Sequence, residues 1–417
     1  MSSNTQVEQT LRHILQVINP TRDDWEARFH IIEDVRDAVQ TVESLRGATV
    51  EPFGSFVSNL FTRWGDLDIS IEILTGSHIS NTARKQKQSW LADVLRALRR
   101  KGTWLKLRFV ANARVPILKL EHKLQNISCD ISINNLLGQM KSKMLFWINA
   151  IDGRFRDMVL LVKEWAGAHD LNESKSGSLN SYCLSLLVIF HFQTCVPAIL
   201  PPLKELYPGD MAHDLRGVRT DAEKQIEETC AVNINRFRLN RFRQRNPSSL
   251  SDLLISFFAK FSDIDVRASE QGINPYSGEW EDVESNMAWL PRTFALYVED
   301  PFEQPANTAR SVTSNNLTRL ADACRATNYI LSSNDHNQAA LFATLVGQHR
   351  LPTATRSQVR NTNNPGNYNQ GRPWVNRSHQ SRDTRNNGHS SSANRNRPVQ
   401  PNQSQAQQQT WRPRPSS

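Results

Sequence analysis

Two runs of alternating apolar and polar residues predict strands that carry carboxylates on one face. In Leu67–Ile71 every second residue is aliphatic, and Asp66 and Asp68 occupy the alternate positions. Asn126–Asn134 repeats this pattern and places Asp130 among its polar positions. Side chains alternate between the two faces of a strand, so we expect the aliphatic residues in the core and the aspartates on the opposite face.

Longer stretches with helical spacing surround these strands, and two further alternating runs lie between them. From Lys141 to Val346 the spacing of apolar residues is largely helical. The fold class is therefore α/β plus helical, with a small mixed sheet that has helices on one side. We predict helices at Val7–Ile18, Trp25–Leu45 and Ser89–Lys101, and additional strands at Trp104–Asn112 and Arg114–Lys123.

The pattern and composition divide the chain into four segments. We assign N-terminal helices to 1–45, an α/β domain to 46–140, a mainly helical central domain to 141–346 and a polar tail to 347–417. The tail is rich in Asn, Gln, Ser, Arg and Pro. It has too few aliphatic residues to offset the entropy of ordering, so we expect it to be disordered.

The tail also carries the basic charge of the chain. The formal net charge is +9, and eleven arginines from Arg350 onward oppose Asp383 alone. Arginines interspersed with Tyr368, Trp374 and Trp411 suit loose electrostatic and stacking contact with RNA. A solubilising tail without a dedicated ligand is an equal alternative.

Neither a disulfide framework nor a membrane span is indicated by the sequence. The five cysteines are widely spaced and none forms a CxxC pair, so we expect a reducing compartment. The longest hydrophobic segment, Cys183–Leu200, contains His191, Gln193 and Pro197. This segment is typical of a buried core helix, and we expect no membrane partner.

The three aspartates Asp66, Asp68 and Asp130 predict a divalent metal site. Crowded carboxylates repel one another unless a cation lies between them, and oxygen ligands beside a phosphate favour Mg2+ or Mn2+. Aspartates on adjacent strands can hold two ions that stabilise the attacking and leaving oxygens of nucleotidyl transfer. A solvated acidic strand is the ordinary alternative for a lone Asp-x-Asp triplet, and the upstream pair Gly54–Ser55 argues against it.

This arrangement resembles the noncanonical poly(A) polymerase and terminal uridylyltransferase family, whose members are DNA polymerase beta-like nucleotidyltransferases. The resemblance covers roughly residues 10 to 345 and looks closest to the plant enzymes that uridylate small RNAs. It implies that the N-terminal helices pack with the central domain. The residues that carry it are Gly54, Ser55, Asp66, Asp68 and Asp130, together with the segments Leu160–Asn172, Leu179–Leu187 and Glu299–Arg310.

The resemblance implies contacts to the triphosphate. Ser55 and the backbone after Gly54 would meet the terminal phosphates, because glycine lets the main chain approach closely; a simple tight turn is the alternative. Lys163 is an isolated cation in an apolar helix, and the triphosphate would be its anion. Pairing with Glu164 or snorkelling to solvent is the ordinary alternative.

The resemblance also implies contacts to the base. Tyr182 would stack on the base and Ser181 would offer a hydroxyl to phosphate or base, whereas core packing is the usual role of such a tyrosine. Asp300 and Glu303 would order the recognition loop or reach the base through water.

Some positions depart from the family pattern. A second phosphate lysine is missing, because Gly167 stands four residues after Lys163. The gapless alignment places Lys141 and Ser142 where many members have an Asn-Thr pair for the ribose, so the ribose contact stays unassigned. Ala306 stands where several uridylyltransferases have a uracil-selecting histidine, so uracil preference rests on the overall resemblance.

The resemblance implies an enzyme that adds UMP from UTP to the single-stranded 3′ end of an RNA. Small RNA such as miRNA or siRNA, Argonaute as a partner, and activity in the nucleus and cytoplasm are implied in the same way. A poly(A) polymerase adding AMP is the nearest alternative. An RNA-binding adaptor with an inactive transferase fold is a different class, and the presence of all three aspartates counts against it.

Two basic clusters in the ordered part are candidate RNA contacts. Arg96–Lys101 ends a predicted helix, where cations are favoured electrostatically without any RNA. Arg236–Arg245 interleaves five arginines with Phe237 and Phe242. Positive charge with aromatic faces suits single-stranded RNA, although the two phenylalanines could equally anchor a helix to the core.

Overall fold

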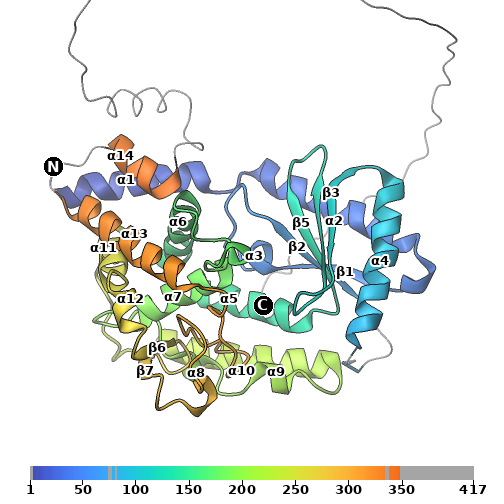
Figure 1. Cartoon of the computed structure of the whole chain (residues 1–417). Helices are drawn as coiled ribbons and strands as arrows, with labels where there is room; N and C mark the ends of the chain where they lie inside the picture. Colours follow the sequence, from blue (N-terminus) through green and yellow to red (C-terminus); the bar gives the residue numbers. More distant parts are fainter. Residues whose placement is uncertain (1–2, 74–77, 80–81, 334–337, 348–417) are drawn as a thin grey trace, which may run out of the picture. The chain divides into compact units, whose positions relative to one another are not determined.

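The computed structural model describes residues 3–73, 78–79, 82–333 and 338–347, which fold into helices and two small sheets (Figure 1). The predicted disorder of the tail concerns residues that, apart from Gly347, lie outside this described part. The predicted fold class, a sheet with helices followed by a mainly helical region, is confirmed.

The larger sheet has the strand order β1-β2-β5-β4-β3. β2 and β5 run parallel in its centre, and the other neighbouring pairs are antiparallel. The four strands predicted by alternation form, three of them shorter than the alternating runs and β2 one residue longer, and β1 precedes them as the fifth strand of the sheet. The five strands are β1 (Thr49–Phe53), β2 (Leu67–Glu72), β3 (Trp104–Val110), β4 (Ile117–His122) and β5 (Ser128–Ile133).

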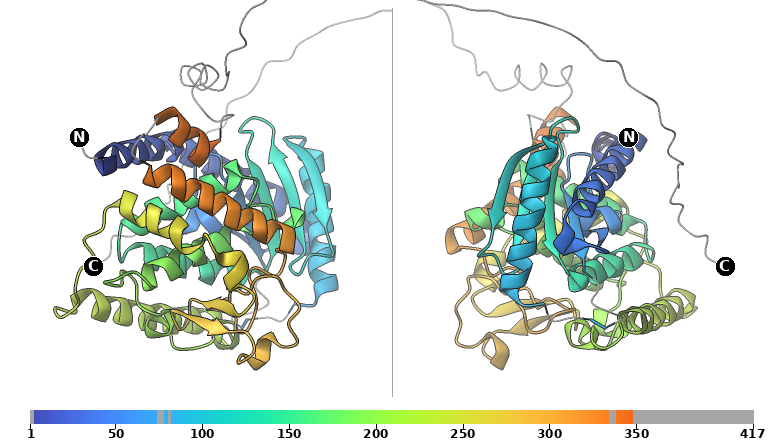
Figure 2. Two further views of the ribbon diagram at one scale, coloured as in Figure 1. Left: turned by 60° about the vertical axis from the view of Figure 1, so that its left-hand side comes forward. Right: turned by 90° about the vertical axis from the view of Figure 1, so that its right-hand side faces the viewer.

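Helices α2 (Arg22–Gln40) and α4 (Arg84–Lys101) cover one face of this sheet, and the right view of Figure 2 looks onto α4 there. A capping box between Thr21 and Asp24 starts α2 before Trp25. The helix ends at Gln40, and the short 3-10 helix η1 (Glu43–Leu45) follows where we expected α2 to continue. The uncovered face of the sheet is left for the site.

The second core consists mainly of helices: α1 (Ser3–Ile18), α5 (Leu136–Asn149), α6 (Arg154–Ala168), α7 (Ser181–Gln193), α10 (Arg219–Leu239), α11 (Leu250–Lys260), α13 (Ser314–Ser332) and α14 (Gln338–Val346). Shorter elements complete it: α8 (Leu203–Leu206), α9 (Met211–Asp214), α12 (Ile264–Arg267), η2 (Ser174–Ser176) and η3 (Met287–Trp289). The hairpin β6 (Gln271–Asn274) and β7 (Glu279–Asp282) is the exception to the helical pattern.

The two N-terminal helices pack in different cores. The buried side chains of α1, such as Leu11 and Ile14, belong to the helical core. Those of α2, such as Ile31 and Val35, belong to the sheet core. The prediction that both helices pack with the central domain is therefore wrong for α2, whose apolar stripe is buried against the strands instead.

No helix in the described part of the chain combines the length and apolar character that crossing a bilayer requires.

Candidate functional site: a carboxylate-lined cavity

A cavity of about 560 Å³ lies between the uncovered face of the sheet and the helices that follow it. Its lining brings together residues from β2, β4 and β5, from the short helix α3 (Gly54–Val57), and from α5, α6 and α7. The predicted site residues that line it are Gly54, Ser55, Asp66, Asp68, Asp130, Lys163, Ser181 and Tyr182.

The three aspartates converge as the alternation predicted. Asp68 and Asp130 are direct register partners on the parallel strands β2 and β5, and Asp66 lies just before β2. Asp66 is exposed to the cavity, while Asp68 and Asp130 are half-buried in its wall. Desolvation within this cleft, followed by the charges of Asp130 and Asp66, raises the pKa of Asp68 to about 7. Desolvation and the charge of Asp130 also raise the pKa of Asp66.

Lys119 is a site residue that the sequence analysis missed. It lies on β4 opposite Asp130, and its ammonium forms an ion pair with the Asp130 carboxylate. It is half-buried and lines the cavity. The alternation of Ile117–His122, in which Leu118 and Leu120 are buried, was the available signal, because it places Lys119 on the polar face of the sheet.

The carboxylates fit a divalent metal by their chemistry. They offer only oxygen ligands. Desolvation, followed by the charges of the neighbouring aspartates, raises the pKa of Asp66 and Asp68, and a nearby cation would oppose this shift. Among the described residues, no group of three or more His, Cys, Asp or Glu side chains is closed around a common ion position. The predicted cluster is thus gathered in one cavity without forming a preassembled cage, and Asp130 is paired with Lys119.

Local contacts hold the chain close to Asp68. Gly54 begins α3 with φ +67°, and a Cβ there would lie 2.0 Å from the Asp68 Oδ2 atom. The Gly54 N–H donates to Ser142 Oγ at 2.7 Å, and Ser142 donates in turn to the Gly138 carbonyl. Ser142, one of the two residues at the unassigned ribose position, therefore anchors the loop that carries Gly54.

A buried arginine fixes the segment before Asp66. Arg28 of α2 is fully buried, packs over the Phe61 ring at 4.6 Å, and donates to the carbonyls of Arg63 and Gly65. These bonds satisfy backbone acceptors at the turn into β2, where no strand partner is available. The guanidinium thus determines where the first aspartate enters the cavity.

Lys163 reaches the cavity from α6, as predicted for a phosphate contact. Its ammonium donates to the Leu60 carbonyl at 2.7 Å. Desolvation lowers the pKa of Lys163, and the charges of Glu164, Asp68 and Asp66 oppose this effect. Glu164, the alternative partner of Lys163, accepts from Thr62 Oγ1 at 2.6 Å.

An ionic cluster lies beside Tyr182, where the sequence analysis places the nucleobase. The Tyr182 hydroxyl donates to Asp300 Oδ1 at 3.0 Å, and Lys141 forms ion pairs with Asp300 and, at 2.9 Å, with Glu303. Arg114, from the turn between β3 and β4, pairs with the other Glu303 oxygen. Desolvation and the Asp300 charge raise the pKa of Tyr182 well above its ordinary value, so its ring stays neutral.

The segment Glu299–Arg310, which the resemblance identifies as the recognition loop, lies next to this cluster. Asp300 is buried, and its N–H donates to the Ala306 carbonyl at 2.8 Å. Of the described residues, Lys141 and Tyr182 line the cavity, whereas Asp300, Glu303 and Ala306 do not. The two acidic residues are therefore placed to hold Lys141 and Tyr182, and direct contact of their carboxylates with a base is not what this arrangement offers.

The two basic clusters have different surroundings. On α4, Arg96 pairs with Asp93, and Lys101 pairs with Asp34 at 3.0 Å, in line with a structural role. In Arg236–Arg245, Phe242 is fully exposed and does not anchor the helix to the core.

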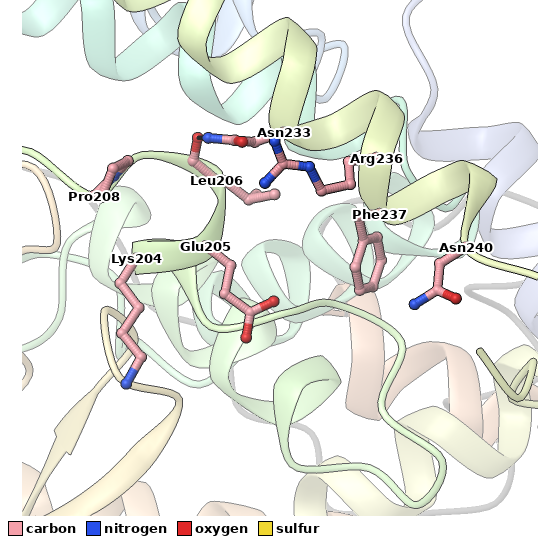
Figure 3. Close-up of a pocket in the computed structure, with 8 residues that line it drawn as sticks. All are labelled: Lys204, Glu205, Leu206, Pro208, Asn233, Arg236, Phe237 and Asn240. Carbon is pink, nitrogen blue, oxygen red and sulfur yellow. Dashed lines mark hydrogen bonds between the residues drawn. The ribbon is translucent and has the colours of Figure 1, made fainter. Parts of the chain in front are cut away.

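The Arg243 guanidinium lies over the Phe237 ring, 4.2 Å from its centre. Phe237, with Arg236 and Lys204, lines a separate cavity of about 370 Å³ between α8 and α10 (Figure 3). This cavity shares no lining residue with the aspartate cavity.

Comparison with known proteins agrees with this geometry. A family model described as "Poly(A) RNA polymerase, mitochondrial-like, central palm domain" matches residues 7–149. Protein HESO1 of Arabidopsis thaliana is 59% identical over 349 residues, which cover 84% of this chain and 68% of that protein. The mitochondrial poly(A) RNA polymerase of Drosophila melanogaster is 27% identical over 378 residues, and the match spans 81% of this chain but only 58% of that protein.

A solved structure shows the same fold. The crystal structure of the Cid1 poly(U) polymerase superposes with a TM-score of 0.63 at 22% sequence identity, covering 81% of this chain and 98% of that chain. With a carboxylate-lined cavity between a mixed sheet and a helical domain, and with these relatives, the chain belongs to the noncanonical poly(A) polymerase and terminal uridylyltransferase family of RNA nucleotidyltransferases.

Proposed function

We propose that this protein adds UMP from UTP to the 3′ ends of single-stranded small RNAs without a template, which promotes their turnover. The observation that carries the proposal is the convergence of Asp66, Asp68 and Asp130 in a cavity that Tyr182 also lines. The similarity to HESO1 and the poly(U) polymerase fold support the uridylyl assignment.

Each part of the cavity has a proposed task. Asp66 and Asp68 would hold two divalent cations, Mg2+ or Mn2+, and Asp130 would share the one nearer the RNA. When bound, such cations supply positive charge to the attacking 3′-hydroxyl and to the leaving pyrophosphate.

Ser55, Ser181 and Lys163 would bind the triphosphate, because hydroxyls and an ammonium satisfy phosphate oxygens. The neutral Tyr182 ring would stack on the base, and its hydroxyl bond to Asp300 fixes the ring plane. These contacts orient the α-phosphate for attack, and orientation of this kind contributes a large part of such rate enhancements.

The acceptor is the less constrained half of the proposal. The exposed arginines at the end of α10, with the exposed Phe242 beside them, offer charge and an aromatic face to an RNA strand. Argonaute-bound miRNA or siRNA as acceptor, and activity in the nucleus and cytoplasm, are proposed from the resemblance to plant small-RNA uridylyltransferases. Transfer of AMP is the second candidate, favoured by the similarity to mitochondrial poly(A) RNA polymerase.

Extension of a labelled single-stranded RNA by the purified protein, with each ribonucleotide offered separately and Mg2+ or Mn2+ present, tests the proposal. We expect UTP to give the most extension. Asp66→Asn and Asp68→Asn should abolish extension and keep a cooperative melting transition, since removing a crowded charge relieves repulsion.

Asp37→Asn is the matched control, because Asp37 lies on α2 with a side chain 67% exposed. Full activity of either site variant would refute the metal assignment, and a preference for ATP would replace uridylyl by adenylyl transfer.

A further inference from the structure

Lys141 lies in the part of the cavity next to Tyr182, where the nucleobase is expected. It projects from α5 into the cavity that holds Asp66 and Asp68, and its ammonium lies over the Tyr182 ring, 5.4 Å from the ring centre. Its side chain is 15% exposed. A base stacked on Tyr182 would therefore meet this ammonium at its edge, in surroundings where a hydrogen bond is stronger than in water.

The acidic residues beside Lys141 are already occupied by donors. Asp300 Oδ1 accepts from the Tyr182 hydroxyl at 3.0 Å and from the Phe302 N–H at 3.1 Å, and its other oxygen is paired with Lys141. Glu303 uses one oxygen for Arg114 and the other for Lys141. All four carboxylate oxygens thus have partners within the protein. The donor that this cluster presents to the cavity is the Lys141 ammonium.

An ammonium has three N–H donors and no acceptor. Two of the Lys141 donors are directed to Asp300 and Glu303, which leaves the third for a ligand. A base edge placed there must offer an acceptor. The uracil edge carries a carbonyl oxygen, O4, where cytosine and adenine carry amino groups that only donate.

We propose that Lys141 selects the base by donating to this exocyclic carbonyl, so that uracil is accepted and cytosine and adenine are disfavoured. The inference deepens the proposed function and rests on it. Ala306 has no polar side chain that could select uracil. The selecting donor comes instead from α5, and Asp300 and Glu303 hold it in place. A site built to donate rejects an analogue that presents a second donor, because one buried group is then left unpaired.

Competition between UTP and CTP in one reaction tests the proposal, because the two pyrimidines have the same size. We expect the wild-type protein to favour UTP. Lys141→Met, which keeps the aliphatic stem, should lower the UTP:CTP incorporation ratio by roughly tenfold or more. Lys141→Arg retains charged donors and should keep most of the preference. Both nucleotides compete in the same reaction, so the UTP:CTP incorporation ratio does not depend on the folded fraction of a variant.

Lys143→Met is the matched control. Lys143 lies on the same helix but pairs with Glu223 at 3.1 Å and is not among the residues that line the cavity, so its ratio should equal that of the wild type. An unchanged ratio in Lys141→Met would overturn the proposal. So would a change in the UTP:dUTP ratio with an unchanged UTP:CTP ratio, because Lys141 would then contact the ribose.

Binding measurements separate this inference from the proposed function. If the wild-type protein extends no RNA, the proposed function fails. Calorimetric affinities of the wild type and Lys141→Met for UTP and CTP then still decide the role of Lys141: a ratio that falls in the variant supports it, and an equal ratio in both proteins refutes it.

Discussion

At the residue scale, the carboxylate-lined cavity depends on the absence of a side chain at Gly54. The positive φ of this glycine turns the chain from β1 into α3, and its Cα then approaches the Asp68 carboxylate so closely that a Cβ would overlap it. Two requirements therefore coincide at one position, a left-handed backbone and empty space beside a carboxylate. At other described glycines with a positive φ, such as Gly47 and Gly102, the left-handed backbone occurs without a neighbouring carboxylate.

We predict that Gly54→Ala abolishes RNA extension, because the new methyl group must displace Asp68. Gly47→Ala is the control that isolates backbone strain: Gly47 has φ +79° and nothing within 4 Å of an added Cβ. Both variants should lose about 1–2 kcal/mol of unfolding free energy in urea, and only Gly54→Ala should lose activity. Equal activity in the two variants would show that Asp68 tolerates displacement.

Residues that depend on local pattern were predictable, and residues that depend on distant partners were not. Alternation and the Gly-Ser pair sufficed for Asp66, Asp68 and Asp130, because strand geometry fixes which side chains share a face. The ion pair of Lys119 with Asp130 needs the register between β4 and β5, which a single sequence does not specify. The side-chain partners of Asp300, Lys141 on α5 and Tyr182 on α7, lie more than one hundred residues away along the chain.

At the scale of elements, the recognition loop is held by backbone bonds around a buried acid. Glu299 pairs with Asn307 in an isolated bridge, and the Val298 N–H donates to Asn307 Oδ1 at 3.0 Å. Glu299 is 5% exposed. Burial, the charge of Glu281 and then that of Asp300 raise the pKa of Glu299 to about 7. The loop therefore contains a carboxyl group that the fold prefers to keep protonated.

Because Glu299 stays protonated in the folded state, the free energy of unfolding is expected to fall as the pH rises. The folded state retains a proton on Glu299 between its ordinary pKa of 4.5 and about 7, so the stabilising effect is fully present below pH 4.5 and is lost as the pH rises through 7.

Glu299→Gln should therefore raise the unfolding free energy by roughly 2 kcal/mol more at pH 8 than at pH 5. Urea unfolding at both pH values measures this difference, with the exposed Glu279→Gln on β7 as the control. A gain that is the same at both pH values would contradict the prediction.

The types of the elements were more predictable than their ends. Helix α4 begins at Arg84, five residues before the predicted start, because polar residues in its first turn hide the apolar period. Its end was correct, since Gly102 in the left-handed conformation terminates it. The hairpin β6–β7 is too short for its alternation to stand out against the surrounding helices.

At the scale of the whole molecule, a buried ionic contact joins the sheet core to the helical core. Glu72, at the end of β2, is 3% exposed and accepts from Arg219 of α10 at 2.7 Å and from Gln139 of α5 at 2.7 Å. Arg219 also donates to Glu223 at 2.6 Å. The strand that carries Asp68 is thus tied at its far end to helices of the other core.

We predict that Arg219→Leu lowers the unfolding free energy by about 3 kcal/mol, because it leaves the Glu72 carboxylate buried without its cation. Lys224→Leu is the control, since the Lys224–Glu228 pair on the same helix is exposed and contributes little. Adding Glu72→Gln to Arg219→Leu should restore part of the loss in urea unfolding. No recovery in the double variant would mean that Arg219 stabilises by packing alone.

Packing between cores was the least predictable level. The periodicity of residues 1–45 revealed two amphipathic helices, but not that one would pack on the helices and the other on the strands. Both surfaces are apolar, and an amphipathic stripe does not distinguish between them.

The parallel pairing of β2 with β5 has a consequence for how activity arises during folding. Asp68 and Asp130 are 62 residues apart in the chain, and α4, β3 and β4 lie between them in the sequence. Closing such a long loop is slow and delays contacts of high sequence separation. We therefore expect a refolding chain to form much of its helix and hairpin structure before Asp68 and Asp130 lie side by side. The recovery of RNA extension would then follow the completion of the sheet.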